Sequence, residues 1–196
     1  MSRTAEIRRT TKETDIALAL NVDGSGKVAV STGLGFLDHM LTALAFHARF
    51  DLSLTCKGDL HIDDHHTAED VAIALGQALD KALGDRAGIA RFADAHAPLD
   101  ESLARVVVDF SGRPYVFADL GFKRPSIGDV ATENLTHVFR SFGTAARMTL
   151  HVDVLRGDND HHRAEAAFKA LALALRKAVA KSSFGDVAST KGTVSA

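Results

Sequence analysis

Residues 63–70 read Asp-Asp-His-His-Thr-Ala-Glu-Asp, and residues 158–166 read Asp-Asn-Asp-His-His-Arg-Ala-Glu-Ala. Both copies contain two adjacent histidines, with a glutamate three positions after the second one. Apolar residues then recur with helical spacing over residues 71–83 and 166–179. Each copy is therefore predicted to occupy the first turn of a long helix.

The spacing within each copy suits metal binding. Residues four apart share one face of a helix, so the first histidine and the glutamate of each copy can bind the same ion. These residues are His65, Glu69, His161 and Glu165. The second histidine, His66 or His162, projects about 100° further round, so one turn can supply ligands to two ions. A single His-His pair at a helix start is often only solvated, but two copies with identical spacing favour a metal site.

The composition narrows the choice of metal and of partner. Imidazole and carboxylate ligands suit divalent ions such as Mn, Fe, Co, Ni or Zn, and the single cysteine, Cys56, argues against a thiolate site. A formal charge of -2 gives no basic surface for nucleic acid. The N-terminal residues lack the apolar core that a signal peptide would have, and no apolar run approaches the length of a membrane span, so a cytoplasmic location is expected.

Alternating and helical patterns predict the elements of the first half. The predicted strands cover residues 5–10, 16–22, 27–31 and 50–56, and a helix covers 36–46. The Asp-Gly-Ser-Gly turn at residues 23–26 predicts a hairpin between the second and third strands. His39 lies inside the helix and can meet the motif histidines if the helices pack together.

The second half repeats this order. Its predicted strands cover residues 103–110, 115–118 and 147–155, its first helix covers 129–142 and its motif helix runs from 161 to about 181. The first two strands are expected to form a hairpin through residues 111–114. His137 lies 24 residues before His161, much as His39 lies 26 before His65.

We therefore predict an internal duplication with a period of about 96 residues. The fold class is α/β, an α+β two-layer arrangement built from two strand-strand-helix-strand-helix units whose sheets pack against helices. The halves are expected at residues 1–92 and 93–196, fused into one catalytic domain. Six histidines and two glutamates suffice for two metal ions. Each site could combine both halves, or a neighbouring chain could complete it.

Further polar residues could contact a substrate. Glu13 lies in the polar connection 10–15, where the pattern alone favours an ordinary surface position. The small, polar C-terminal tail contains Ser189 and Lys191, which together with Arg91 and Arg113 are groups expected around a phosphate. No nucleotide-binding loop is present, so a small phosphorylated substrate is favoured over a nucleotide.

Several stretches closely resemble the imidazoleglycerol-phosphate dehydratase family, in its monofunctional form. They are Phe-Leu-Asp-His-Met-Leu at 36–41, the two motif copies at 65–70 and 159–171, and the segments 97–101, 109–114 and 189–192. The chain departs from the family at Thr136 and Val138, where Glu-His-Phe is common, and at Ala43, where many members carry glutamine. These departures bear on fine substrate contacts rather than on metal ligands.

The resemblance implies a reaction and a set of roles. The reaction is the metal-dependent dehydration of D-erythro-imidazole glycerol phosphate to imidazole acetol phosphate in L-histidine biosynthesis, through an imidazolate held between two Mn(II) ions. The implied metal ligands are His39, His65, His66, Glu69, His137, His161, His162 and Glu165. The implied catalytic residues are Glu13 together with the ligands of the two motifs, and the implied substrate contacts are Glu13, Arg91, Arg113, Ser189 and Lys191.

The resemblance also implies a homo-oligomer in which trimers assemble into an octahedral shell of about 24 subunits. Two other functions stay open from the residues themselves. A dinuclear hydrolase would use paired metals to activate water, and a metal-binding shell protein would use the histidines for assembly or storage.

Overall fold

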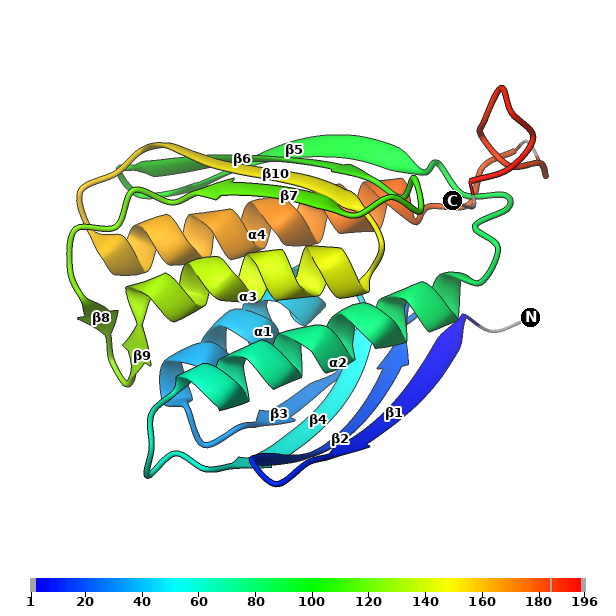
Figure 1. Ribbon diagram of the computed structural model, residues 1–196. Helices are drawn as coiled ribbons and strands as arrows, with labels where there is room; N and C mark the ends of the chain where they lie inside the picture. The colour runs from blue at the N-terminus through cyan, green and yellow to red at the C-terminus, as the bar shows by residue number, and fades with distance from the viewer. Residues whose placement is uncertain (1–2, 184, 195–196) are drawn as a thin grey trace.

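In the part of the chain that the structure describes, two four-stranded sheets form opposite sides, and four helices lie between them (Figure 1). This arrangement is seen in a computed structural model, which describes residues 3–183 and 185–194. Each sheet and its two helices come from one half of the chain, and the halves meet through their helices.

The first unit contains one sheet of order β1-β2-β4-β3 and two helices. Its elements are β1 (Thr4–Thr10), β2 (Thr14–Asn21), β3 (Val28–Ser31), α1 (Gly35–Ala48), β4 (Asp51–Gly58) and α2 (His65–Leu83). In β2 the residues Ile16, Leu18 and Leu20 are buried, while Ala19 between them is exposed. This alternation turns one face of the sheet toward the helices.

The second unit repeats that plan, with the sheet order β5-β6-β10-β7. Its elements are β5 (Phe92–Leu99), β6 (Ser102–Asp109), β7 (Tyr115–Asp119), β8 (Ser126–Ile127), β9 (Val130–Ala131), α3 (Thr132–Ala145), β10 (Thr149–Arg156) and α4 (Asp160–Ala178). Both sheets place the strand that follows the first helix third in the order. The duplicated α/β fold is thus confirmed. The predicted unit has two strands before its first helix, whereas the first unit has three and the second has five, including the short β8 and β9.

The two predicted hairpins are wrong. β3 does not pair with β2 but runs parallel to β4, with Val28 opposite Leu52. Likewise β7 runs parallel to β10, with Tyr115 opposite Thr149. A carboxylate oxygen of Asp51, the first residue of β4, accepts the backbone N–H groups of residues 25, 26 and 27 at 2.8–3.1 Å. These hydrogen bonds hold the turn against β4, so the next strand lies beside β4 rather than beside β2.

The helices pack in two pairs, α2 with α3 and α1 with α4. At Gly76 in α2, an added Cβ would lie 2.6 Å from the backbone oxygen of Phe142 in α3, so the two backbones approach closely. Phe139 of α3 and Phe168 of α4 join the pairs, with ring centroids 4.7 Å apart. These contacts fix how the two halves sit on each other.

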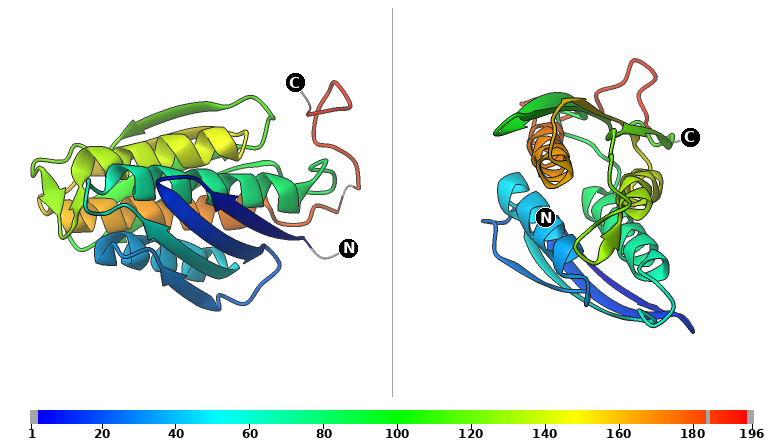
Figure 2. Two further views of the ribbon diagram at one scale, coloured as in Figure 1. Left: turned by 60° about the horizontal axis from the view of Figure 1, so that its bottom comes forward. Right: turned by 90° about the vertical axis from the view of Figure 1, so that its left-hand side faces the viewer.

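All four helices begin at the same end of the molecule. The right-hand view of Figure 2 looks onto this end, with the sheets above and below the helices. The predicted ligands lie in the first two turns of their helices. The fold therefore gathers them at one end, while the C-terminal tail lies near the other end (Figure 1).

Candidate metal centre

One group of ligand atoms forms between α1 and α4. His39 Nε2 lies 3.2 Å and His161 Nε2 lies 3.3 Å from the same oxygen, Oε2 of Glu165. One ligand atom from each of these residues lies within 4.8 Å of the other two. We call this group the α1–α4 cluster.

The second group forms between α2 and α3 and is called the α2–α3 cluster. His137 Nε2 lies 3.0 Å from Glu69 Oε1, and His65 Nε2 lies 3.6 Å from Glu69 Oε2. The two imidazole rings stack with centroids 5.2 Å apart. Asn134, which the sequence reasoning missed, has Oδ1 2.8 Å from His65 Nδ1. Its position three residues before His137, on the same face of α3, was the available signal.

Each cluster combines both halves of the chain. The motif turn at the start of α2 meets the helical histidine of the second half, and the motif turn of α4 meets His39 of the first half. Six of the eight expected ligands are therefore divided three and three. His66 and His162 do not join either cluster.

His66 instead lies beside two carboxylates. Its Nδ1 is 3.0 Å from Asp59 Oδ2, and its Nε2 is 3.8 Å from Glu13 Oε1. The hydrogen bond to Asp59 raises the pKa of His66. Glu13 is half exposed and lies beside this histidine. The sequence pattern alone predicted a surface position for Glu13, and the resemblance predicted a position near the substrate.

His162 has a similar environment. Its Nδ1 is 2.7 Å from Glu101 Oε2, and its Nε2 is 4.0 Å from Asp100 Oδ2. Glu101 also accepts the backbone N–H groups of Asn159 at 2.9 Å and Asp158 at 3.1 Å. These backbone contacts and His162 hold the pKa of Glu101 far below its usual range, while Glu101 raises the pKa of His162.

The glutamates of both clusters favour the ionised form. The hydrogen bond from His137 is the main cause of the lowered pKa of Glu69. Burial alone would raise the pKa of Glu165, but Lys169 and His39 outweigh it and the pKa is lowered. An ionised carboxylate is the form that binds a metal.

The four expected phosphate contacts line one surface recess of about 660 Å³. They are Arg91, Arg113, Ser189 and Lys191. Arg91 is already engaged there, because it donates two hydrogen bonds to the Asp109 carboxylate and one to the Ala188 carbonyl. Asp109 was not singled out from the sequence, since a lone aspartate at a strand end has no distinctive spacing.

The recess and the clusters lie at opposite ends of a single chain. The backbone N–H of Arg91 donates to the carbonyl of Ala178, the last residue of α4, whereas His161 is the second residue of that helix. The 19 residues of α4 span about 27 Å at 1.5 Å per residue. A small molecule cannot contact both regions of one chain.

The fold and the site define a duplicated α/β protein with two His₂Glu clusters. The family model for imidazoleglycerol-phosphate dehydratase matches residues 32–175 of the chain. An imidazoleglycerol-phosphate dehydratase of Zymomonas mobilis is 55% identical and covers 99% of this chain and 100% of its own length. One of Phytophthora nicotianae is 62% identical over 98% of this chain, which spans only 42% of that longer protein. The chain belongs to the imidazoleglycerol-phosphate dehydratase family.

The comparison of structures agrees with this assignment. The crystal structure of imidazoleglycerol-phosphate dehydratase from Staphylococcus aureus matches with a TM-score of 0.83 and 36% identity, covering 91% of this chain and 99% of that one. The chain is thus a hydro-lyase of histidine biosynthesis. Within the described residues, none of the helices combines the length and the apolar character needed to cross a membrane. The cytoplasmic location and the division at residues 92 and 93 stay predictions.

Proposed function

We propose that this chain dehydrates imidazole glycerol phosphate to imidazole acetol phosphate with two divalent metal ions, most simply Mn(II), in each active site. The observation that carries this proposal is the pair of clusters, each with two imidazoles and one carboxylate within 4.8 Å. Neither cluster contains a thiol, because the single cysteine of the sequence, Cys56, is not among the grouped residues.

The donor set fits such ions. Mixed imidazole and carboxylate ligation suits borderline divalent metals, and three protein ligands leave positions for substrate or water. When bound, two ions would stabilise a deprotonated imidazole ring of the substrate, which eases departure of the C3 hydroxyl and loss of the C2 proton.

The helices and side chains of the protein would also stabilise the negative charge of the deprotonated ring. All four helices direct their N-terminal ends, the positive ends of their dipoles, toward the region of the clusters. This potential favours negative charge on a substrate. Glu13, half exposed and close to His66, is the candidate for proton transfer at C2 or at the departing hydroxyl.

The substrate's phosphate would bind in the recess at the other end of the chain. Arg113 and Lys191 supply cationic donors there, and Ser189 supplies a hydroxyl. Since one small substrate cannot reach from this recess to the clusters of the same chain, we infer that each active site is built from more than one subunit. This supports a homo-oligomer, for which trimers assembled into an octahedral shell are the proposed form.

His66 and His162 would complete the metal sites of neighbouring subunits. Each has its Nδ1 held by a carboxylate, of Asp59 or Glu101, and its Nε2 outside both clusters of its own chain. A histidine whose Nδ1–H is donated to a carboxylate has its Nε2 lone pair available for a metal.

The test is formation of imidazole acetol phosphate by metal-stripped protein, before and after Mn(II) is restored. Activity should vanish on stripping and return with about two ions per chain. A folded, metal-loaded assembly that stays inactive would support a metal-binding shell protein instead. Release of phosphate would support a dinuclear hydrolase, because dehydration leaves the phosphate attached.

A further inference from the structure

Residues 121–131, which we call the strap, cross the end of the molecule at which the helices begin. The strap connects β7 to α3 and contains the short strands β8 and β9. Ile127 and Val130 anchor it, since their side chains are buried. In the right-hand view of Figure 2 the strap passes in front of the helices.

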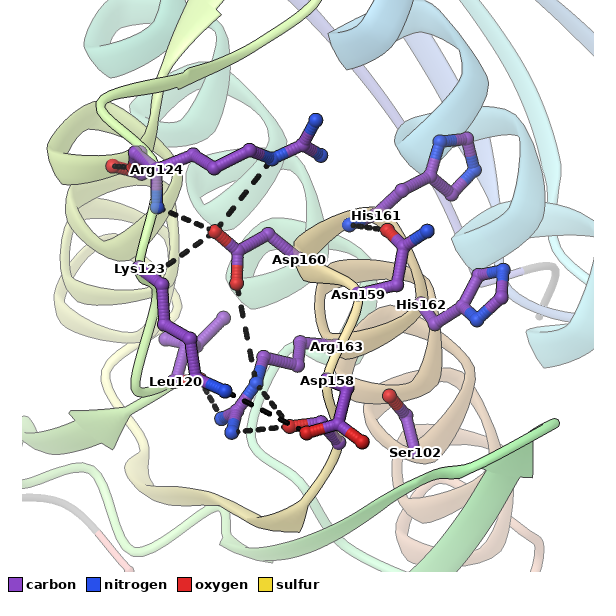
Figure 3. A network of polar contacts seen from close by, with 12 residues as sticks. Ser102, Leu120, Lys123, Arg124, Asp158, Asn159, Asp160, His161, His162 and Arg163 are labelled. Carbon is purple, nitrogen blue, oxygen red and sulfur yellow. Dashed lines mark hydrogen bonds and ion pairs between the residues drawn. The ribbon is translucent and has the colours of Figure 1, made fainter.

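The strap is bonded to α4 through Asp160, the residue directly before His161. Asp160 is 2% exposed, and its Oδ2 accepts the backbone N–H groups of Lys123 at 2.9 Å and Arg124 at 2.7 Å. Arg163, one turn further along α4, donates to the carbonyl of Leu120 just before the strap. Figure 3 shows the Asp160 carboxylate directed toward the strap, away from the rings of His161 and His162.

The strap is bonded to α1 through Asp129. The two carboxylate oxygens of Asp129 accept the N–H groups of Gly35 at 2.6 Å and Phe36 at 3.2 Å. Leu34 is the residue at the N-cap position of α1, and its apolar side chain cannot accept these N–H groups. Asp129 therefore caps the helix from another part of the chain, one turn before His39.

The strap is bonded to α2 through Asp64. Asp64 precedes His65, and its Oδ2 accepts the N–H of Ala131 at 2.8 Å. Ala131 is in turn the residue directly before α3, which carries His137. This one hydrogen bond joins the starts of the two helices that form the α2–α3 cluster.

We propose that Asp64, Asp129 and Asp160 are positioning residues that set the ligand separations in the two clusters through the strap. Asp129 and Asp160 act on the α1–α4 cluster, and Asp64 acts on the α2–α3 cluster. Each contact is a charge-assisted hydrogen bond from backbone N–H groups to a carboxylate, and either the carboxylate or the N–H group lies at a helix start. Such a bond fixes direction as well as distance. The inference rests on the proposed metal function, because it assigns these residues to metal ligands.

The experiment titrates Mn(II) into metal-stripped protein in two backgrounds. His39→Ala disables the α1–α4 cluster, so the remaining ion reports on the α2–α3 cluster; His137→Ala does the reverse. In the His39→Ala background, Asp64→Ala should weaken Mn(II) binding by about 10- to 100-fold and Asp129→Ala should not change it. In the His137→Ala background, Asp129→Ala should weaken Mn(II) binding by the same factor and Asp64→Ala should not change it. Asp160→Asn should behave like Asp129→Ala.

Asp158→Ala is the matched control. Its carboxylate is 91% exposed and meets the strap at the exposed side chain of Lys123, 3.6 Å away, rather than at backbone N–H groups, so the variant should leave both sites unchanged. Where an alanine variant does not fold, Mn(II) is titrated into the asparagine variant at that position instead. The asparagine variant should weaken Mn(II) binding at the same cluster, by a smaller factor. Equal weakening of both sites by Asp64 and Asp129 variants, or no weakening, would overturn the proposal. Failure of the unmodified chain to bind Mn(II) would instead refute the proposed metal function.

Discussion

His137 Nε2 lies 3.0 Å from Glu69 Oε1, although 68 positions separate the two residues and they come from different halves of the chain. The reciprocal pair, His39 Nε2 and Glu165 Oε2, lies 3.2 Å apart across 126 positions. Each half thus supplies a motif turn to one cluster and a single histidine to the other. The α1–α4 cluster therefore needs α1 packed on α4, and the α2–α3 cluster needs α2 packed on α3.

Removing one of these histidines should affect one ion only. We expect His137→Ala to weaken binding of one Mn(II) per chain by at least about tenfold while the other ion stays bound, because the α1–α4 cluster is intact. Metal titration of the stripped protein measures this. His96→Ala, at an exposed position on β5, is the control and should keep both ions. Loss of both ions in His137→Ala would show that the clusters are not independent.

Glu13 should matter for turnover and not for metal content. Glu13→Gln keeps the shape of the side chain but removes its ability to exchange a proton. We expect kcat to fall by about 100-fold or more, with about two ions per chain retained. Glu6→Gln, an exposed glutamate on β1, should have normal kcat. Normal turnover in Glu13→Gln would remove this residue from proton transfer.

The helical positions of the ligands could be predicted because they follow from local spacing. His65 and Glu69 share a helix face by geometry alone, and the start of α2 at His65 agrees with the prediction. The meeting of His39 with Glu165, rather than with the motif of its own half, depends on how the halves dock. No local pattern specifies that packing.

Strand partners were predicted less well for a related reason. Alternation identifies which residues of β3 face the core but not which strand lies beside it. β5 was missed altogether, since Ala95, Ala97 and Pro98 give little apolar contrast. Asp59 and Glu101 were missed as partners of His66 and His162, because those contacts depend on loops rather than on helical spacing.

The phosphate recess should act separately from the metal sites. Arg113→Ala removes a cation that can bond to a phosphate, an interaction of about 1.5–3 kcal/mol. We expect KM to rise by about 10- to 100-fold with both ions retained, as measured by steady-state kinetics and metal analysis. Arg140→Ala, at an exposed position on α3, is the control. Loss of metal from Arg113→Ala would contradict the separation of roles.

Asp51 should make stability depend on pH in acid. The backbone N–H groups of Lys27 and Ser25 lower the pKa of Asp51 below its usual value of 3.8. A lowered pKa in the folded state stabilises the fold above the unfolded pKa, and this contribution is lost as pH falls through the folded pKa. Asp51→Asn should therefore unfold at lower urea than the native chain at pH 7, and the difference should shrink below about pH 3.8. Asp119→Asn, exposed on β7, should show no such difference at fixed protein concentration.

Gly76 tests the close approach of α2 and α3 on which the α2–α3 cluster depends. Helix propensity alone would favour Gly76→Ala by about 1 kcal/mol. An added Cβ would, however, lie 2.6 Å from the Phe142 oxygen and 2.7 Å from Ala145 Cβ, so the helices must move apart. We expect a net destabilisation of about 1–3 kcal/mol in thermal unfolding, together with weaker binding of one Mn(II) ion. Gly185→Ala has open space around the new Cβ and should be neutral. If Gly76→Ala were as stable as the native chain with both ions retained, the two helices would not need this contact to hold the cluster.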